Sequence, residues 1–190
     1  KAKNNNAIVI LMNEKSRCFF NLMQYNDCLS HLEKTFAFIN NPTTNFDEKT
    51  KNLKLHYYYR LKSLSYYYLS DFKTAIPNFI TGINLYKAAG SFENIKSAIY
   101  LQNYLTKIYT KQGETNKALE IYNEQLELYI KLNDKANIAS TLNDIALAEF
   151  KIAQYRNAIR DFTSAENIYI ESDDFYNAGF CKSNIGQAYW

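Results

Sequence analysis

A helical pattern recurs in the sequence at intervals of 40 to 47 residues, and this recurrence constrains the fold more than any other feature. Each full copy has an alanine, an aromatic residue four positions later and a tyrosine eleven positions later. The full copies start at Ala75, Ala118 and Ala158, and a weaker copy starts at Cys28. Positions i, i+4 and i+11 lie on one face of an α-helix, so each copy predicts an amphipathic helix. Repetition with such a period is the sequence signature of a helical solenoid.

The clearest copy spans residues 142–169 and predicts two helices joined by a tight turn. The apolar positions of the first helix are Leu142, Ile145, Ala146 and Ala148, and those of the second are Ala158, Ile159, Phe162, Ala165, Ile168 and Tyr169. These spacings form the stripe of an amphipathic helix. Because neither helix can bury its stripe alone, the sequence predicts stacked helix pairs.

Few residues interrupt the helical pattern. Five glycines and two prolines in 190 residues favour long helices with short connections over a fold rich in strands and turns. We predict nine helices, at residues 6–23, 26–39, 47–69, 72–88, 92–111, 115–131, 135–152, 155–171 and 175–190. The predicted fold is all-α, with one domain over residues 1–190. Its repeats are expected at 6–39, 47–88, 92–131 and 135–171, followed by a single first helix at 175–190.

Charge and cysteine content argue against several classes of function. A net charge of +3 is too small to predict a nucleic-acid or anionic membrane surface. The sequence has no apolar run of about 18 residues, so no membrane-spanning helix is predicted. Three cysteines without a CxxC pair favour a reduced, cytoplasmic protein, with a segment of a periplasmic sensor as the alternative.

The sequence shows no catalytic or metal-binding constellation. His31 and His56 lie in different repeats, and neither belongs to a spacing typical of metal ligands. Glycine-rich phosphate loops, nucleophile–base pairs and paired carboxylates on a defined scaffold are also missing. We therefore expect no enzyme activity, no cofactor and no metal.

The repeats resemble those of the tetratricopeptide repeat (TPR) family over nearly the whole chain. That family pairs Leu-Gly and Tyr on a first helix with Ala, Phe and Ala on a second. The best matches here are residues 184–189, Asn-Ile-Gly-Gln-Ala-Tyr, and the set Ala158, Phe162 and Ala165. Their length of about 40 residues is similar to that in bacterial peptide-pheromone receptors and in repeat modules attached to bacterial sensors. The resemblance implies a right-handed superhelical solenoid of antiparallel helix pairs.

The resemblance also implies a concave groove lined by the first helices. Projected onto this chain, it assigns partner binding to Asn13, Arg17, Tyr57, Arg60, Tyr67, Tyr100, Asn103, Lys107, Lys111, Asn143, Phe150, Lys151 and Asn184. Phe20, Leu64, Leu147 and Ser183 fall on the same faces. Amides can pair with a peptide bond, cations can hold carboxylates and aromatic rings can form anchoring pockets. The surface therefore favours a peptide or protein segment with acidic character.

Simpler explanations exist for some of these residues. Asparagine is abundant in the chain, so its recurrence at Asn103 and Asn143 also fits compositional bias. The basic run Lys49, Lys51, Lys54, Arg60 and Lys62 fits a solvated helix face better than a phosphate site. Two tyrosine triplets, at residues 57–59 and 66–68, cover most of a helix circumference, so some of their rings must lie outside the core.

Three functions remain open at this stage. The first is a protein-binding or peptide-binding module, the second is a ligand-sensing input domain of a bacterial signalling or transcriptional regulator, and the third is a structural scaffold. Residues 175–190 are rich in aromatic side chains and have no second helix after them. We therefore expect the chain to be part of a longer one, or to self-associate through this end.

Overall fold

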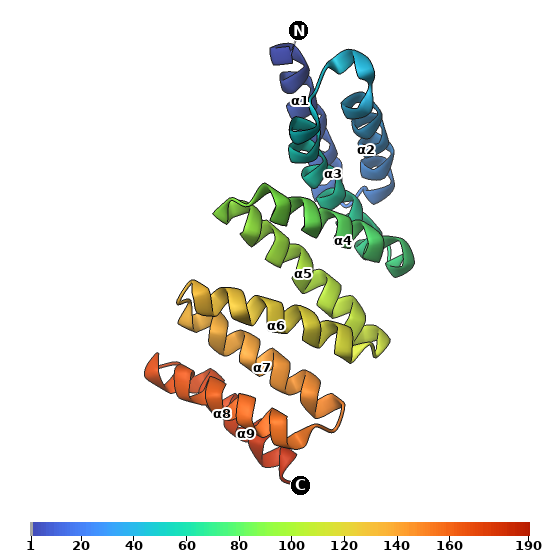
Figure 1. Cartoon of the computed structure of the whole chain (residues 1–190). Helices are drawn as coiled ribbons and strands as arrows, with labels where there is room; N and C mark the ends of the chain where they lie inside the picture. The colour runs from blue at the N-terminus through green and yellow to red at the C-terminus, as the bar shows by residue number, and fades with distance from the viewer. Residues whose placement is uncertain (1) are drawn as a thin grey trace. The chain divides into compact units, whose positions relative to one another are not determined.

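In the computed structural model, the described part of the chain folds into nine α-helices and one short 3₁₀ helix (Figure 1). The structure describes the backbone of residues 2–190 and the side chains of residues 4–190. The α-helices are α1 (Ala2–Asn21), α2 (Tyr25–Asn40), α3 (Glu48–Tyr68), α4 (Phe72–Ala89), α5 (Phe92–Gln112), α6 (Thr115–Lys131), α7 (Lys135–Lys151), α8 (Tyr155–Glu171) and α9 (Phe175–Ala188), and η1 is Pro42–Thr44. The predicted all-α repeat fold is confirmed, and the helix ends agree with the sequence prediction to within four residues.

The chain divides into two compact units. Unit 1 extends to Leu105 and unit 2 runs from Thr106 to Trp190, so the boundary falls within α5. In unit 1, α1 packs on α2, α2 on α3 and α3 on α4. In unit 2, α6 packs on α7, α7 on α8 and α8 on α9. Within each unit, these helices therefore pack against their neighbours in sequence, as in stacked helix pairs.

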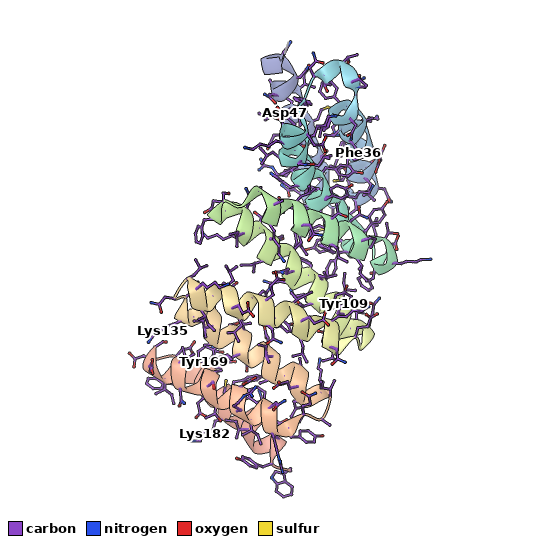
Figure 2. The ribbon with its side chains drawn as sticks, in the orientation of Figure 1. Phe36, Asp47, Tyr109, Lys135, Tyr169 and Lys182 are labelled. Atoms are coloured by element: carbon purple, nitrogen blue, oxygen red, sulfur yellow. The ribbon has the colours of Figure 1, made fainter. Side chains whose placement is uncertain are left out.

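The core of unit 1 is built where α2 and α3 meet. Cys28, Leu32, Tyr58 and Leu61 are buried together there. Phe36 of α2, labelled in Figure 2, belongs to this region. Its ring packs on that of Tyr58 with the ring centroids 4.9 Å apart. Cys28 replaces the alanine of the repeat and acts as a small buried apolar side chain, because burial raises the pKa of its thiol and keeps it protonated.

Close packing within unit 1 also depends on a glycine in α4. A Cβ atom added at Gly82 would lie 3.1 Å from Cδ1 of Leu101 and 3.3 Å from Cβ of Tyr59. Leu101 is fully buried. The absence of a side chain at Gly82 therefore lets α4 approach its neighbours on both sides.

The core of unit 2 contains the residues that define the repeat. Ala158, Phe162 and Ala165 of α8 are fully buried and pack with Ala146 and Cys181. Leu142, Leu147 and Ile185 contact this cluster from α7 and α9. The small residues of α8 thus let two helices pack against it, which explains why the alanine recurs at each copy of the pattern.

The connections between the helices share one backbone feature. Each contains a residue with a positive φ between 53° and 77°, and these residues are Met23, Asn45, Ser70, Gly90, Gly113, Asn133, Ala153 and Asp173. Several of the following helices are capped by an aspartate. Asp71, Asp134 and Asp174 accept hydrogen bonds from the backbone N–H three residues later, at 3.1–3.2 Å. The left-handed residue ends one helix, and the cap then starts the next.

No helix in the described part of the chain is both long and apolar enough to span a membrane.

Candidate partner-binding pocket

A pocket of about 270 Å³ opens on the first helices of unit 1. Its walls are Arg17, Phe20 and Asn21 from α1, Tyr57, Arg60, Leu61 and Leu64 from α3, and Tyr100 from α5. The pocket is therefore formed by the first helices of three successive repeats. Its walls contain two guanidinium groups and no carboxylate.

Helical periodicity explains why these side chains converge. On α3, Tyr57, Arg60 and Leu64 are separated by three and four residues, so they lie on one face. On α1, Arg17 and Phe20 have the same spacing. The helices themselves are held by the buried residues next to these faces, Tyr58 on α3 and Ser16 on α1. The apolar core thus fixes the direction in which the polar face points.

Arg60 interacts with two tyrosines, Tyr100 and Tyr86. Its guanidinium carbon lies 5.1 Å from the centroid of the Tyr100 ring, within the range of a cation–π contact. Burial raises the pKa of Tyr86, while the charge of Arg60 and a side-chain hydrogen bond with it oppose that rise. His56 stacks on Tyr86 at 4.4 Å, and burial, assisted by the charge of Arg60, lowers the pKa of His56 to about 4. His56 is therefore neutral at pH 7, and the positive charge at this position is that of Arg60.

The Tyr57 hydroxyl is buried without a hydrogen-bond partner among the described residues. Burial raises its pKa, and the charges of Arg17, Glu14 and Arg60 all act on it. The hydroxyl is thus a protonated donor near both guanidinium groups. Oδ1 of Asn13, one turn before Arg17, is likewise buried without a partner in the described part of the chain. Buried polar groups normally find partners, so both atoms are candidates for contact with a ligand.

Arg17 forms an ion pair with Glu14, one turn earlier on α1. The two side chains are 55% and 47% exposed, so water and salt screen their attraction. Glu14 does not line the pocket, but its carboxylate contacts a pocket arginine.

Aromatic side chains continue the pocket wall across unit 1. Phe20 packs on Tyr68 at 5.8 Å, and the Tyr68 hydroxyl lies 3.2 Å from that of Tyr104. The Tyr104 hydroxyl lies 3.2 Å from that of Tyr100 on its other side. Tyr25 stacks on Tyr68 at 5.3 Å. This tyrosine row joins two residues of the pocket, Phe20 and Tyr100, and orders the surface beside it.

Four of the predicted binding residues come together in this pocket: Arg17, Tyr57, Arg60 and Tyr100. Phe20 and Leu64, expected on the same faces, also line it. Tyr67 lies elsewhere, because its ring packs against Phe72 and Tyr104 at 5.8 Å and 4.9 Å. The structure thus places Tyr67 among packing residues on the side facing α4.

The other predicted residues lie outside this pocket. Asn103, Lys107 and Lys111 are exposed on α5. In unit 2, Asn143 accepts a weak hydrogen bond from the Cys181 thiol at 3.6 Å, and Phe150 packs on Tyr155 at 5.4 Å. Lys151 is exposed, and Nδ2 of Asn184 is buried without a partner in the described part of the chain. Phe175, Tyr176 and Phe180 are exposed on α9.

Sequence reasoning missed two residues of the pocket wall, Asn21 and Leu61, and the ion-pair partner of Arg17, Glu14. The spacing i, i+4 from Arg17 and from Tyr57 could have indicated Asn21 and Leu61. The i, i+3 spacing of Glu14 and Arg17, which places opposite charges one turn apart, could have indicated the ion pair.

Two further pockets have simpler walls. One of about 480 Å³ lies between α3 and α4, beside Lys49, Asn52, Leu53, Leu85, Ala88 and Ala89. The other, of about 370 Å³, is lined by the consecutive residues 153–157. Neither combines two cations with aromatic rings, so the pocket at Arg17 and Arg60 is the better candidate for a binding site.

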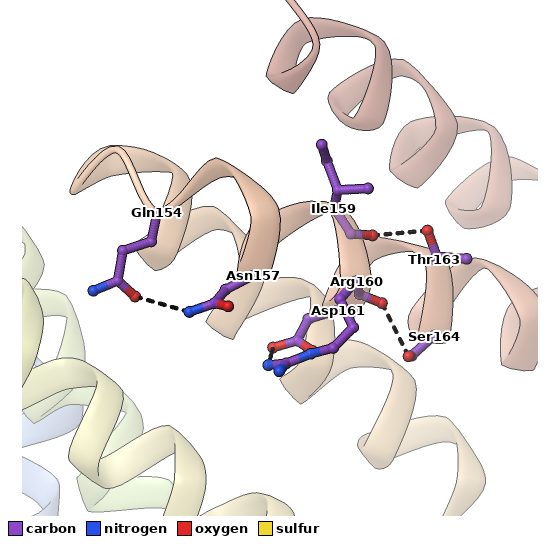
Figure 3. Close-up of polar contacts among 7 residues, drawn as sticks. All are labelled: Gln154, Asn157, Ile159, Arg160, Asp161, Thr163 and Ser164. Atoms are coloured by element: carbon purple, nitrogen blue, oxygen red, sulfur yellow. Dashed lines mark hydrogen bonds and ion pairs between the residues drawn. The ribbon is translucent and has the colours of Figure 1, made fainter.

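A pair of buried acids lies between α7 and α8. Glu149 and Asp161 are each 7% exposed, and Oε2 of Glu149 has no donor among the described residues. Arg160 donates to Asp161 from Nε at 2.7 Å and from Nη2 at 3.1 Å (Figure 3). Burial and the charge of Asp161 raise the pKa of Glu149 to about 7. In the part of the chain that the structure describes, no group of three or more His, Cys, Asp or Glu side chains could hold a metal ion.

The fold and the pocket define a class of protein, a helical-repeat protein with a polar and aromatic pocket on its first helices. Residues 97–171 match the family model of the tetratricopeptide repeat. This part of the chain therefore consists of tetratricopeptide repeats, as the sequence pattern predicted. No curated protein matches the sequence.

Solved structures support the same fold at low sequence identity. The apo form of RapI is 14% identical, with a TM-score of 0.73 over 94% of this chain and 49% of RapI, so this chain spans about half the length of RapI. A kinesin light chain protein of Podosopora anserina, with nearly identical TPR-like repeats, is 13% identical, with a TM-score of 0.66 over 95% of this chain and 85% of that one. BtubC (BKLC) from P. vanneervenii is 15% identical, with a TM-score of 0.58 over 97% and 80%.

Proposed function

We propose that this protein is a binding module that holds an acidic segment of a partner protein in the pocket between α1, α3 and α5. Tetratricopeptide repeats are a fold for protein interaction and scaffolding. The observation that carries the proposal is the convergence of Arg17 and Arg60 on a pocket whose other walls are aromatic and aliphatic. The module performs no chemistry of its own.

The size of the pocket favours a partner side chain over a small molecule. Sites for small molecules and cofactors are typically ~300–1,000 Å³ in volume. At about 270 Å³, this pocket suits one or two side chains of a longer segment. Aromatic walls are typical of the anchoring pockets in protein interfaces.

The charges of the pocket favour an anion. A guanidinium group binds a carboxylate through charge-assisted hydrogen bonds, and the pocket offers two such groups. The Tyr57 hydroxyl can donate a third hydrogen bond to the same anion, since it has no acceptor in the described part of the chain. An acidic side chain next to an aromatic or aliphatic one therefore fits both kinds of wall.

The test uses two short dye-labelled peptides. In the first, Phe alternates with Glu (the Phe/Glu peptide). In the second, Gln replaces each Glu (the Phe/Gln peptide). Fluorescence anisotropy should show tighter binding of the Phe/Glu peptide. Arg60→Met should weaken that binding by about five- to tenfold, as expected for one charge-assisted hydrogen-bonding group.

The matched control is Lys73→Met, which removes one positive charge from an exposed position of α4 outside the pocket. It should change the affinity less than twofold. Equal binding of the two peptides, or equal effects of Arg60→Met and Lys73→Met, would contradict the proposed site.

A further inference from the structure

We infer that Glu14 is an internal competitor for the anion site, so that an acidic ligand binds by replacing the Glu14 carboxylate on Arg17. This inference rests on the proposed function and adds a residue that limits affinity. Three observations carry it: the contact of Glu14 with Arg17, the position of Arg17 in the pocket wall, and the electrostatic relation of both residues to Tyr57.

The geometry places one carboxylate of the chain against one of the two pocket arginines. Glu14 and Arg17 lie one turn apart on α1, and their side chains are in contact without any residue of another helix. The guanidinium group of Arg60 lies over the Tyr100 ring, and it can keep this contact while its N–H groups bind an anion. The two arginines therefore differ, since Arg17 must change its partner when an acidic ligand enters and Arg60 need not.

Tyr57 shows that both charges act on the pocket. Arg17 and Arg60 favour the ionised form of the hydroxyl, and Glu14 disfavours it. Glu14 is thus close enough to the pocket to repel an incoming carboxylate as well as to occupy Arg17. Both effects act in the same direction, because each makes binding of an anion less favourable.

The exposure of the pair sets the size of the effect. Exposed ion pairs contribute about 0–1 kcal/mol, so their displacement lowers affinity by up to about fivefold. A competitor of this strength reduces binding without preventing it. It also discriminates, because it opposes acidic ligands and leaves uncharged ligands unaffected.

The test measures binding of the Phe/Glu and Phe/Gln peptides to Glu14→Gln. We expect two- to fivefold tighter binding of the Phe/Glu peptide and no change for the Phe/Gln peptide. The gain should shrink as salt concentration rises, since salt screens exposed charges. The matched control is Glu93→Gln, which removes a carboxylate from another exposed i, i+3 pair, Glu93 with Lys96 on α5. It makes the same change in net charge outside the pocket.

A double-mutant cycle tests whether Glu14 acts through Arg17. In the Arg17→Met background, Glu14→Gln should give little of its gain, because the competed group is missing. A gain no larger than that of Glu93→Gln, or one fully retained in the Arg17→Met background, would overturn the competitor role while leaving the proposed function intact. Failure of the unaltered protein to bind either peptide would instead overturn the proposed function, and the competitor role with it.

Discussion

The guanidinium group of Arg60 lies over the ring of Tyr100, with 5.1 Å between the guanidinium carbon and the ring centroid. This contact joins α3 to α5 at the wall of the pocket. The contact keeps the charge of Arg60 at the pocket. Because the guanidinium group contacts the face of the ring, its N–H groups remain available for an acceptor.

Replacement of Tyr100 should therefore affect ligand binding through Arg60. Tyr100→Leu removes the cation–π contact, worth ~0.5–1 kcal/mol at an exposed site, and should weaken binding of the Phe/Glu peptide by about two- to fivefold. Tyr100→Phe keeps the ring and should bind within twofold of the unaltered protein. Equal losses in the two variants, measured by anisotropy, would show that the hydroxyl and not the ring matters.

The adjacent tyrosines Tyr57 and Tyr58 should respond in opposite ways to loss of the hydroxyl. Tyr57→Phe removes a buried hydroxyl without a partner, so the free energy of unfolding should rise by up to about 1 kcal/mol. The same change should weaken binding of the Phe/Glu peptide, because a donor to the ligand is lost. Stability and affinity thus change in opposite directions.

Tyr58→Phe is the matched control. The Tyr58 hydroxyl donates to Glu33 at 2.9 Å and accepts from Lys62 at 2.6 Å. Loss of this network should lower the free energy of unfolding by about 1 kcal/mol. Urea unfolding of both variants is the measurement, and destabilisation by Tyr57→Phe as large as that by Tyr58→Phe would contradict the assignment of the unpaired hydroxyl.

Replacement of Gly82 by a residue with a Cβ atom should destabilise the protein. Ala is normally favoured over Gly in a helix by ~1 kcal/mol, but a Cβ at Gly82 would crowd the buried Leu101 and the backbone side of Tyr59. We expect Gly82→Ala to lower the free energy of unfolding by about 1 kcal/mol. Gly179→Ala in α9, where nothing lies within 4 Å of the added Cβ, should raise it by up to about 1 kcal/mol. Urea unfolding that gives the two variants the same sign would disprove the close approach at Gly82.

The pair Glu149 and Asp161 should make the stability of unit 2 depend on pH. The folded-state pKa of Glu149, about 7, is above its ordinary value of 4.5, so the folded protein binds the proton more tightly than the unfolded chain. This contribution to stability is fully present below pH 4.5 and is lost as pH rises through 7. A protonated Glu149 can also donate a hydrogen bond to Asp161, which the ionised form cannot do.

Glu149→Gln should remove this dependence. The variant should be more stable than the unaltered protein at pH 8, and the difference should decrease towards pH 5. The contributions of other titrating groups to stability are the same in both proteins and cancel in that difference. These groups include His56 and Asp144, whose pKa is raised by burial to about 6. Thermal unfolding of both proteins between pH 5 and pH 8 is the measurement. A difference that stays constant with pH would contradict the raised pKa.

The sequence predicted the helices well because their signals are local. The alanine and aromatic positions depend on the 3.6-residue period alone, and Ala75, Ala118 and Ala158 are each fully buried as that period implies. The close approach at Gly82 was not predicted, because it depends on side chains from two other helices. The breaks between helices near Met23 and Ser70 were predicted, but the positive φ of these two residues was not, since neither residue type favours it.

The pocket was only partly predictable, for a similar reason. Arg17, Tyr57, Arg60 and Tyr100 follow from the face that each helix presents, and the family pattern assigns that face. Tyr67 is different because it lies between two faces of α3, and its contacts with Phe72 and Phe79 depend on how α4 packs. Helical periodicity gives a direction for a side chain, but packing decides what it touches.

The common backbone of the connections has a consequence for how such a chain can be altered. The left-handed position in the connections is occupied by six residue types: methionine, serine, alanine, asparagine, aspartate and glycine. The positive φ in the connection therefore does not depend on one residue type. Helix pairs that begin and end at such left-handed residues can therefore be exchanged or duplicated. Each exchanged pair must still pack against the helices of its new neighbours.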